Sequence, residues 1–179
     1  MSAVSAVSGT AVNGVLSMFQ GKELSLPIGL DPTLYSVQKA LRNLGLEVDT
    51  LVKEKNRYYV QFNNEKLHGN MQLDRETLKL TTLFVQVRAA VVRNESVEKA
   101  VLQAVEKATK KVSRRSTFSY RGYLYMYEKP DSKSKKVAWL RRGSMVKFDP
   151  VLSNKEWVQV KLPSNKKGFV KVKTARLKR

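Results

Sequence analysis

Residues 121–177 read RGYLYMYEKPDSKSKKVAWLRRGSMVKFDPVLSNKEWVQVKLPSNKKGFVKVKTARL. Short runs in which apolar and polar residues alternate are separated by turns rich in Pro, Gly, Asn and Ser, which is typical of short antiparallel strands. The predicted strands are residues 123–127, 137–140, 145–148, 157–160 and 168–170. Because so small a sheet must close or pack on another layer to bury its apolar face, the stretch predicts a small β-barrel.

This stretch also resembles a bacterial SH3 domain. The shared features, in chain order, are Leu124 and Tyr127 before Pro130, the polar turn at residues 131–135, Val137 and Leu140, Gly143 ahead of Met145 and Val146, Trp157 in residues 157–160, and Gly168 in residues 168–170. Gly143 suits a turn that requires a positive φ, and Gly168 lets the chain bend before the last strand. The resemblance implies an SH3-like barrel that binds a ligand or partner and performs no catalysis.

Composition limits the chemistry that the chain can perform. Its 179 residues, of which 42% are hydrophobic, suffice for two small domains with real cores. The absence of cysteine and the single histidine, His68, exclude disulfides, cysteine nucleophiles and multi-histidine metal sites. The net charge of +19 predicts a polyanionic neighbour: nucleic acid, anionic lipid, the carboxylates of peptidoglycan or an acidic protein. No stretch reaches the ~18 apolar residues of a membrane span.

The N-terminal residues 1–21 are small, uncharged and rich in Ser, Ala, Val and Gly. No basic region precedes an apolar core, so they do not form an intact signal peptide. They resemble the start of a mature bacterial lipoprotein, in which a lipidated cysteine precedes a flexible tether. Met1 would then stand in the place of that cysteine, and a lipid there would be the chain's membrane contact. The alternative is an ordinary tail with a short helix over residues 12–19.

Residues 22–110 predict an α+β module with one sheet and two helices on one face. Asp31 as N-cap and Pro32 at the first helical position begin a helix over 32–44, and Gly45 ends it. Asn94 caps a second helix, whose buried stripe comprises Val97, Val101, Leu102, Val105 and Ala108. The expected strands are residues 22–28, 46–53, 57–63, 67–73 and 77–91. The predicted fold class is therefore α+β: an α-β-meander-α module followed by the small SH3-like barrel.

This module resembles a small family of uncharacterised bacterial envelope lipoproteins. The shared features are a helix with Lys39, Ala40 and Leu41 that ends at Leu44 and Gly45, the meander, a strand ending in Val87 and Arg88, and a helix that opens near Asn94. The predicted domain plan is a flexible tether at 1–21, the module at 22–110, a basic linker at 111–119 and the barrel at 120–179.

Catalytic groups are not expected in this chain. The carboxylates of Glu47, Asp49, Asp74 and Glu76 fall mostly in predicted turns or helix ends, where solvation or capping explains them. His68 has no serine and aspartate partners in the pattern, and no glycine-rich phosphate loop is present. The sequence predicts a protein that is not an enzyme and has no cofactor, metal site or catalytic residue.

Aromatic and basic residues form the predicted binding surfaces. With a period of two, Leu124 and Met126 share one face of a strand and are predicted core, which leaves the tyrosines on the other face at a binding surface. The alternative is that half of the rings are core. The predicted aromatic face comprises Tyr120, Tyr123, Tyr125, Tyr127, Trp139 and Trp157. The predicted basic face comprises Lys110, Lys111, Arg114, Arg115, Lys135, Lys136, Arg141, Arg142, Lys166 and Lys167, for which an ordinary solvated surface is the alternative.

Two functions compete on these observations. The first is a periplasmic or outer-membrane lipoprotein scaffold of the bacterial cell envelope, a subunit of a secretion or motility complex that binds peptidoglycan or other envelope proteins and can oligomerise within the assembly. The second is a cytoplasmic nucleic-acid-binding protein that uses its charge and its rings, although no RNA-binding sheet motif is present. An enzyme of cell-wall turnover is a weaker third, because no nucleophile precedes the predicted barrel.

Overall fold

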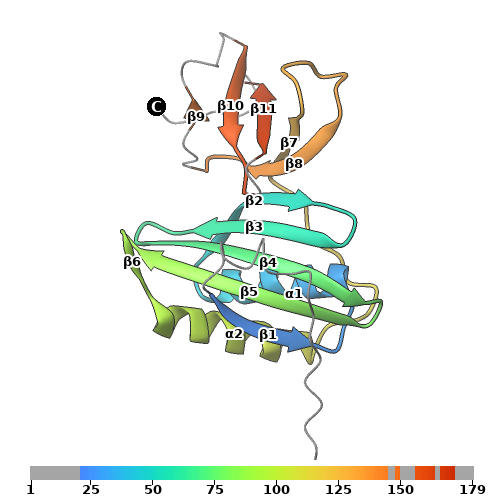
Figure 1. Cartoon of the computed structure of the whole chain (residues 1–179), viewed down its shortest axis with the longest axis vertical. Helices are drawn as coiled ribbons and strands as arrows, with labels where there is room; N and C mark the ends of the chain where they lie inside the picture. The colour runs from blue at the N-terminus through green and yellow to red at the C-terminus, as the bar shows by residue number, and fades with distance from the viewer. Residues whose placement is uncertain (1–20, 145–147, 150–155, 164–165, 172–179) are drawn as a thin grey trace, which may run out of the picture.

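The computed structural model describes residues 21–144, 148–149, 156–163 and 166–171 (Figure 1). The helices are α1 (Leu30–Asn43) and α2 (Glu95–Thr109). The strands are β1 (Lys22–Leu26), β2 (Glu47–Lys53), β3 (Arg57–Asn63), β4 (Leu67–Thr77), β5 (Leu80–Ala89), β6 (Val92–Arg93), β7 (Tyr123–Tyr127), β8 (Lys136–Arg141), β9 (Phe148–Asp149), β10 (Trp157–Lys161) and β11 (Lys167–Lys171). Residues 1–20 of the predicted tether, including the predicted short helix, lie outside the described residues. Residues 145–147 of the predicted strand 145–148 also lie outside them.

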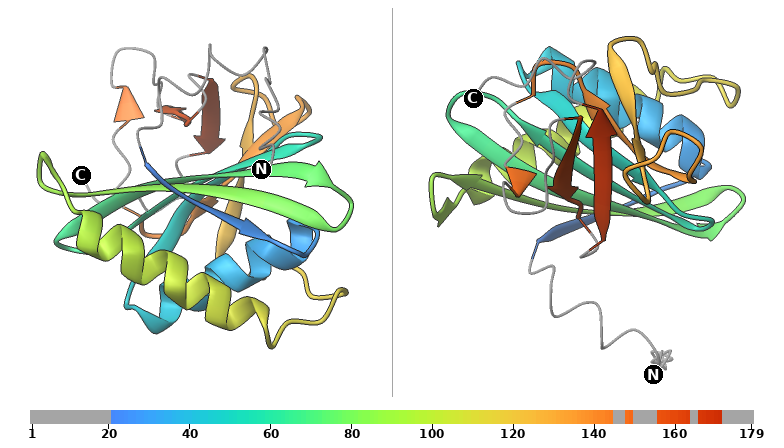
Figure 2. Two further views of the ribbon diagram at one scale, coloured as in Figure 1. Left: turned by 60° about the horizontal axis from the view of Figure 1, so that its bottom comes forward. Right: turned by 90° about the horizontal axis from the view of Figure 1, so that it is seen from above.

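The N-terminal half is an antiparallel sheet in the order β1-β5-β4-β3-β2. Both helices cover the same face of this sheet, as Figure 2 shows in its left view. Side chains from α1, α2 and that sheet face form the first hydrophobic core, in which Leu34, Val60, Val85 and Val105 are fully buried. This burial, rather than helix propensity alone, holds the two helices in place.

The sequence predicted the N-terminal cap of α2 correctly but not that of α1. Asn94 is the N-cap of α2, as predicted, and its side chain accepts a hydrogen bond from the Val97 amide at 3.1 Å. The predicted N-cap of α1 is wrong, because the cap is Gly29 and Asp31 lies inside the first turn. Asp31 instead accepts hydrogen bonds from side chains of β2 and β3, which the local pattern could not reveal. Gly45, just beyond α1, has the positive φ of 69° expected of a residue that ends a helix.

The predicted fold class, an α+β meander module plus a separate small barrel, is wrong. The second strand of the β7–β8 hairpin, β8, pairs with β2 in the register Thr50–Leu140, Leu51–Trp139 and Val52–Ala138. The sheet therefore continues as β2-β8-β7-β11-β10-β9, with β6 attached to β5. Among the described residues its two ends, β1 and β9, do not pair, so the sheet is open and mostly antiparallel.

The pairing with β8 completes the burial of β2. Residues 48–52 are buried without interruption, so this strand has apolar contacts on both faces. Left at the edge of the sheet it would expose unpaired backbone groups beside that apolar surface, and β8 satisfies them. The sheet prediction failed because strand patterns show where strands are and not which strand pairs with which.

A second hydrophobic core lies on the face of the sheet opposite the helices. Val52 and Tyr59 from β2 and β3 pack there against residues of the C-terminal strands. These partners are Leu124, Met126, Ala138, Leu140, Val158, Val160, Leu162 and Val170. The continuous sheet thus bends so that its C-terminal strands cover its own second face, and the helices and C-terminal strands lie on opposite sides (Figure 2).

Several contacts of the chain between α2 and β7 fasten the C-terminal part to the helix layer. Phe118 is buried in the first core. The Gln38 side chain donates to the Ser119 carbonyl at 2.9 Å and accepts from the Ser119 amide at 2.8 Å. The Tyr123 hydroxyl donates to the Val48 carbonyl at 2.8 Å. The end of the predicted linker is thereby packed, and the segment 118–123 has a defined position over the sheet.

Candidate functional site: an aromatic–lysine patch

An aromatic–lysine patch lies where β2 and β8 join. We use this name for Lys53, Tyr58, Tyr120, Tyr125, Lys136 and Trp139. The register aligns Leu51, Trp139 and Tyr125 across β2, β8 and β7, so their side chains share the helix-side face of the sheet. Trp139 packs against the edge of the first core, whereas Tyr125 is 47% exposed. The patch therefore begins at the buried core and extends to solvent.

The rings of the patch contact one another in sequence. The ring centroids of Tyr120 and Trp139 are 5.1 Å apart, and those of Tyr125 and Trp139 are 6.1 Å apart. Phe118 supports Tyr120 from the core side, with centroids 5.1 Å apart. Separations of this size are those of favourable aromatic pairs, so each exposed ring is supported by contact with a neighbouring ring.

Each end of the patch carries a lysine over a ring. Lys136 Nζ lies 3.8 Å from the centroid of Tyr125. Lys53 Nζ lies 4.6 Å from the centroid of Tyr58 and 5.6 Å from that of Tyr120. These are cation–π distances, which orient the two ammonium groups beside the aromatic surface.

The position of Lys53 depends on Asp31 of α1. The Asp31 carboxylate accepts a hydrogen bond from Lys53 Nζ at 3.0 Å and one from the Tyr58 hydroxyl at 2.9 Å. Burial by itself lowers the pKa of Lys53, but its interactions with Tyr120 and Asp31 outweigh burial and raise that pKa to about 12. Lys53 is therefore a permanent cation at neutral pH, held within the ring cluster by a helix terminus.

The structure places the predicted aromatic residues in three settings. Tyr120, Tyr125 and Trp139 belong to the patch, and the predicted alternation is confirmed there because Leu124 and Met126 are buried. Tyr123 is a structural residue whose burial raises its pKa to about 12. Tyr127 and Trp157 form a separate edge-to-face pair, with centroids 5.7 Å apart.

The predicted basic residues are not all available cations. Arg141 pairs with the buried Asp49, and Lys166 pairs with Glu54. Lys136 belongs to the patch. Lys110 forms an exposed ion pair with Glu106 at 3.8 Å. The other exposed cations lie in the segment after α2 or near the C-terminal strands, and comprise Lys111, Arg114, Arg115, Lys135, Arg142 and Lys167. These cations belong to two parts of the chain, the segment between α2 and β7 and the residues in or next to β8 and β11.

The carboxylates considered for catalysis lie in strands rather than in the turns expected for them. Asp49 belongs to β2, and Asp74 of β4 accepts hydrogen bonds from Arg57. Within the part of the chain that the structure describes, no three His, Cys, Asp or Glu side chains are grouped to hold a metal ion. The described helices include none long and apolar enough to span a membrane.

Sequence reasoning missed Lys53, Tyr58 and Asp31 as members of the site. The cross-strand pairing of Lys53 with Tyr58 follows from the β2–β3 hairpin and could have been read from the register. The contribution of Asp31, from a different element, has no local signal. In comparisons with known proteins, no protein-family model matches the chain and no curated protein sequence matches it.

Proposed function

We propose that the protein is a non-enzymatic binding protein of the bacterial cell envelope whose aromatic–lysine patch binds peptidoglycan. The observation that carries the proposal is the cluster of Tyr120, Tyr125 and Trp139, in which the rings contact one another, with a lysine at each end. Partly exposed aromatic rings that pack against one another lose less conformational freedom on binding than isolated rings, and aromatic residues are common in recognition surfaces.

The chemistry of peptidoglycan complements this patch. Its sugars present apolar C–H faces that pack on aromatic rings, and its peptide stems carry carboxylates that attract the exposed Lys136. The net charge of +19 increases the rate at which an anionic polymer reaches the surface. Acidic segments of other envelope proteins offer the same carboxylates, so a partner in a secretion or motility complex is compatible with the same surface.

The proposed location rests on the N-terminal sequence. Residues 1–21 have the small, uncharged composition of the tether of an exported lipoprotein. On this proposal the tether attaches the folded part to the outer membrane, and the patch contacts the cell wall from the periplasmic side. The chain would then serve as a scaffold subunit within a larger, oligomeric assembly.

Substitutions in the patch are expected to weaken binding to purified peptidoglycan sacculi. Tyr125→Ala and Lys136→Ala should each lower the affinity in a co-sedimentation assay about tenfold, a loss of roughly 1.4 kcal/mol. The matched controls are Leu78→Ala and Lys79→Ala in the β4–β5 turn. They likewise remove one large exposed apolar side chain and one exposed lysine, and they should leave affinity unchanged. Wild-type protein that stays in solution, or equal losses in patch and control variants, would remove the proposal.

Nucleic-acid binding is the second candidate because rings flanked by lysines also stack bases beside phosphates. It predicts a gel shift with single-stranded DNA or RNA at moderate salt, lost steeply as salt rises. A complex with nucleic acid that Tyr125→Ala weakens, together with no binding to sacculi, would make this the function. No complex with any single strand or duplex would eliminate it.

A further inference from the structure

The β5–β6 hairpin ends in an exposed apolar tip. The tip consists of Ala89, Ala90, Val91 and Val92, and its valines are 86% and 68% exposed. Ala90 adopts a φ of 54°, a left-handed conformation that turns ordinarily give to Gly or Asn. Neither the backbone geometry nor hairpin chemistry favours Ala-Val at such a turn, so the local fold does not explain why these residues are apolar.

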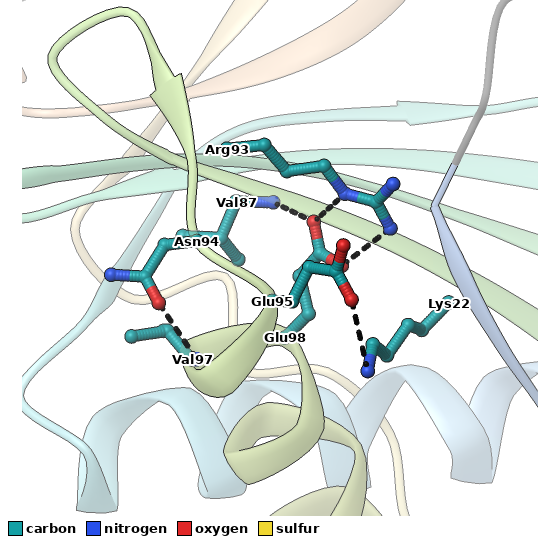
Figure 3. A network of polar contacts seen from close by, with 7 residues as sticks. All are labelled: Lys22, Val87, Arg93, Asn94, Glu95, Val97 and Glu98. Carbon is teal, nitrogen blue, oxygen red and sulfur yellow. Dashed lines mark hydrogen bonds and ion pairs between the residues drawn. The ribbon is translucent and has the colours of Figure 1, made fainter.

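The hairpin is fixed from behind by a polar network (Figure 3). The carboxylate of Glu98, fully buried in α2, accepts a hydrogen bond from the Val87 amide at 3.0 Å. It also accepts two from the Arg93 guanidinium, at 2.9 Å and 2.8 Å. Val87 precedes the tip and Arg93 follows it, so a single carboxylate holds both sides of the hairpin. The valines therefore project from a hairpin that is hydrogen-bonded to α2 on both of its sides.

Cations lie beside the tip. Arg88 is exposed immediately before it, and Lys66 is exposed in the β3–β4 turn, whose next residue, Leu67, pairs with Ala89. The nearby acids are Glu65 of the same turn, Glu98, which pairs with Arg93, and Glu95, which pairs with Lys22. The basic groups thus predominate around the tip, in a chain whose net charge is +19.

We infer that this apolar tip inserts into the surface of an anionic lipid bilayer, with Arg88 and Lys66 at the level of the headgroups. Four small residues are too few for a stable protein interface, which typically buries about 800 Å² on each partner. A bilayer requires no shape complementarity and accepts a few apolar side chains next to cations. This membrane contact is separate from the aromatic–lysine patch and goes beyond the proposed binding of peptidoglycan.

Vesicle flotation with the full chain tests the inference. The probes are vesicles of phosphatidylglycerol and phosphatidylethanolamine, with phosphatidylcholine vesicles as the uncharged comparison. Wild-type protein should float with the anionic vesicles, and the double variant Val91→Ser, Val92→Ser should bind at least about fivefold more weakly. Leu78→Ser is the matched control, because Leu78 is 83% exposed in the turn at the opposite end of β5. It should bind like wild type.

A second measurement locates the insertion directly. The chain has no cysteine, so Val91→Cys and Leu78→Cys each accept a single environment-sensitive fluorophore. Anionic vesicles should shift the emission of the label at position 91 to shorter wavelength and leave that at position 78 unchanged. Absence of flotation, equal flotation of the tip variant and wild type, or equal shifts at both positions would overturn the inference. Circular dichroism establishes that every variant is folded.

Discussion

Replacing Arg141 with alanine is expected to lower the free energy of unfolding by about 3–5 kcal/mol at neutral pH. Arg141 of β8 donates to Asp49 Oδ1 of β2 through Nε at 3.0 Å and Nη2 at 2.6 Å. Asp49 is only 3% exposed, so removal of the guanidinium leaves a buried carboxylate without its cation. This ion pair joins the two halves of the sheet, and urea unfolding of the two proteins measures its loss.

The pH dependence of this effect has a definite sign. Burial raises the pKa of Asp49, and the Arg141 guanidinium only partly opposes that rise. Without Arg141 the pKa rises further, so the variant loses stability as pH rises through that pKa and recovers as Asp49 becomes protonated. Arg142→Ala is the matched control, since it removes the same charge from the adjacent exposed residue and should cost under about 0.5 kcal/mol. Equal effects of the two substitutions would contradict a buried ion pair.

Replacing Glu98 with alanine is expected to cost about 1–3 kcal/mol, because the Val87 amide loses its acceptor in a buried position. Arg93 can turn to solvent and adds little to this loss. Thermal and urea unfolding measure the change. Glu95→Ala is the control, because the Glu95 side chain is 64% exposed and its ion pair with Lys22 is worth under about 1 kcal/mol.

Measuring the free energy of unfolding as pH is lowered separates the contribution of the Glu98 charge from that of its packing. Burial by itself raises the pKa of Glu98, but the hydrogen bonds from Arg93 and Val87 outweigh it and the net pKa lies below its usual value. The stabilisation is therefore complete above the ordinary carboxyl pKa of 4.5 and is lost as pH falls through the lower folded value. Glu98→Gln should remove this part of the pH dependence. An unchanged acid profile would show that the charge of Glu98 does not contribute.

Features encoded by neighbouring residues could be predicted from the sequence. Asn94 caps α2 because its own side chain reaches the Val97 amide three residues later. The alternation of residues 123–127 identified Leu124 and Met126 as core and Tyr125 as exposed, because a strand has a period of two whatever its partner. Gly143 has the predicted positive φ, at 75°.

Features that depend on distant pairing could not be predicted. The pairing of β2 with β8 joins Thr50 to Leu140 and leaves no local pattern, although uninterrupted burial from Val48 to Val52 is its consequence. The same pairing assembles the patch, which takes Lys53 and Tyr58 from the N-terminal half and its other members from beyond α2. It also neutralises Arg141, which the sequence alone presents as one more surface cation.

The central claim is that β2 and β8 join the two halves into one sheet and thereby build the aromatic–lysine patch. Backbone nuclear Overhauser effects measured by NMR on labelled protein test it most directly, and a chain of 20.3 kDa is suitable for this method. The structure predicts cross-strand contacts between Thr50 and Leu140, Leu51 and Trp139, and Val52 and Ala138. Contacts confined to β2–β3 and β7–β8, with none between β2 and β8, would contradict the joined sheet and the patch that depends on it.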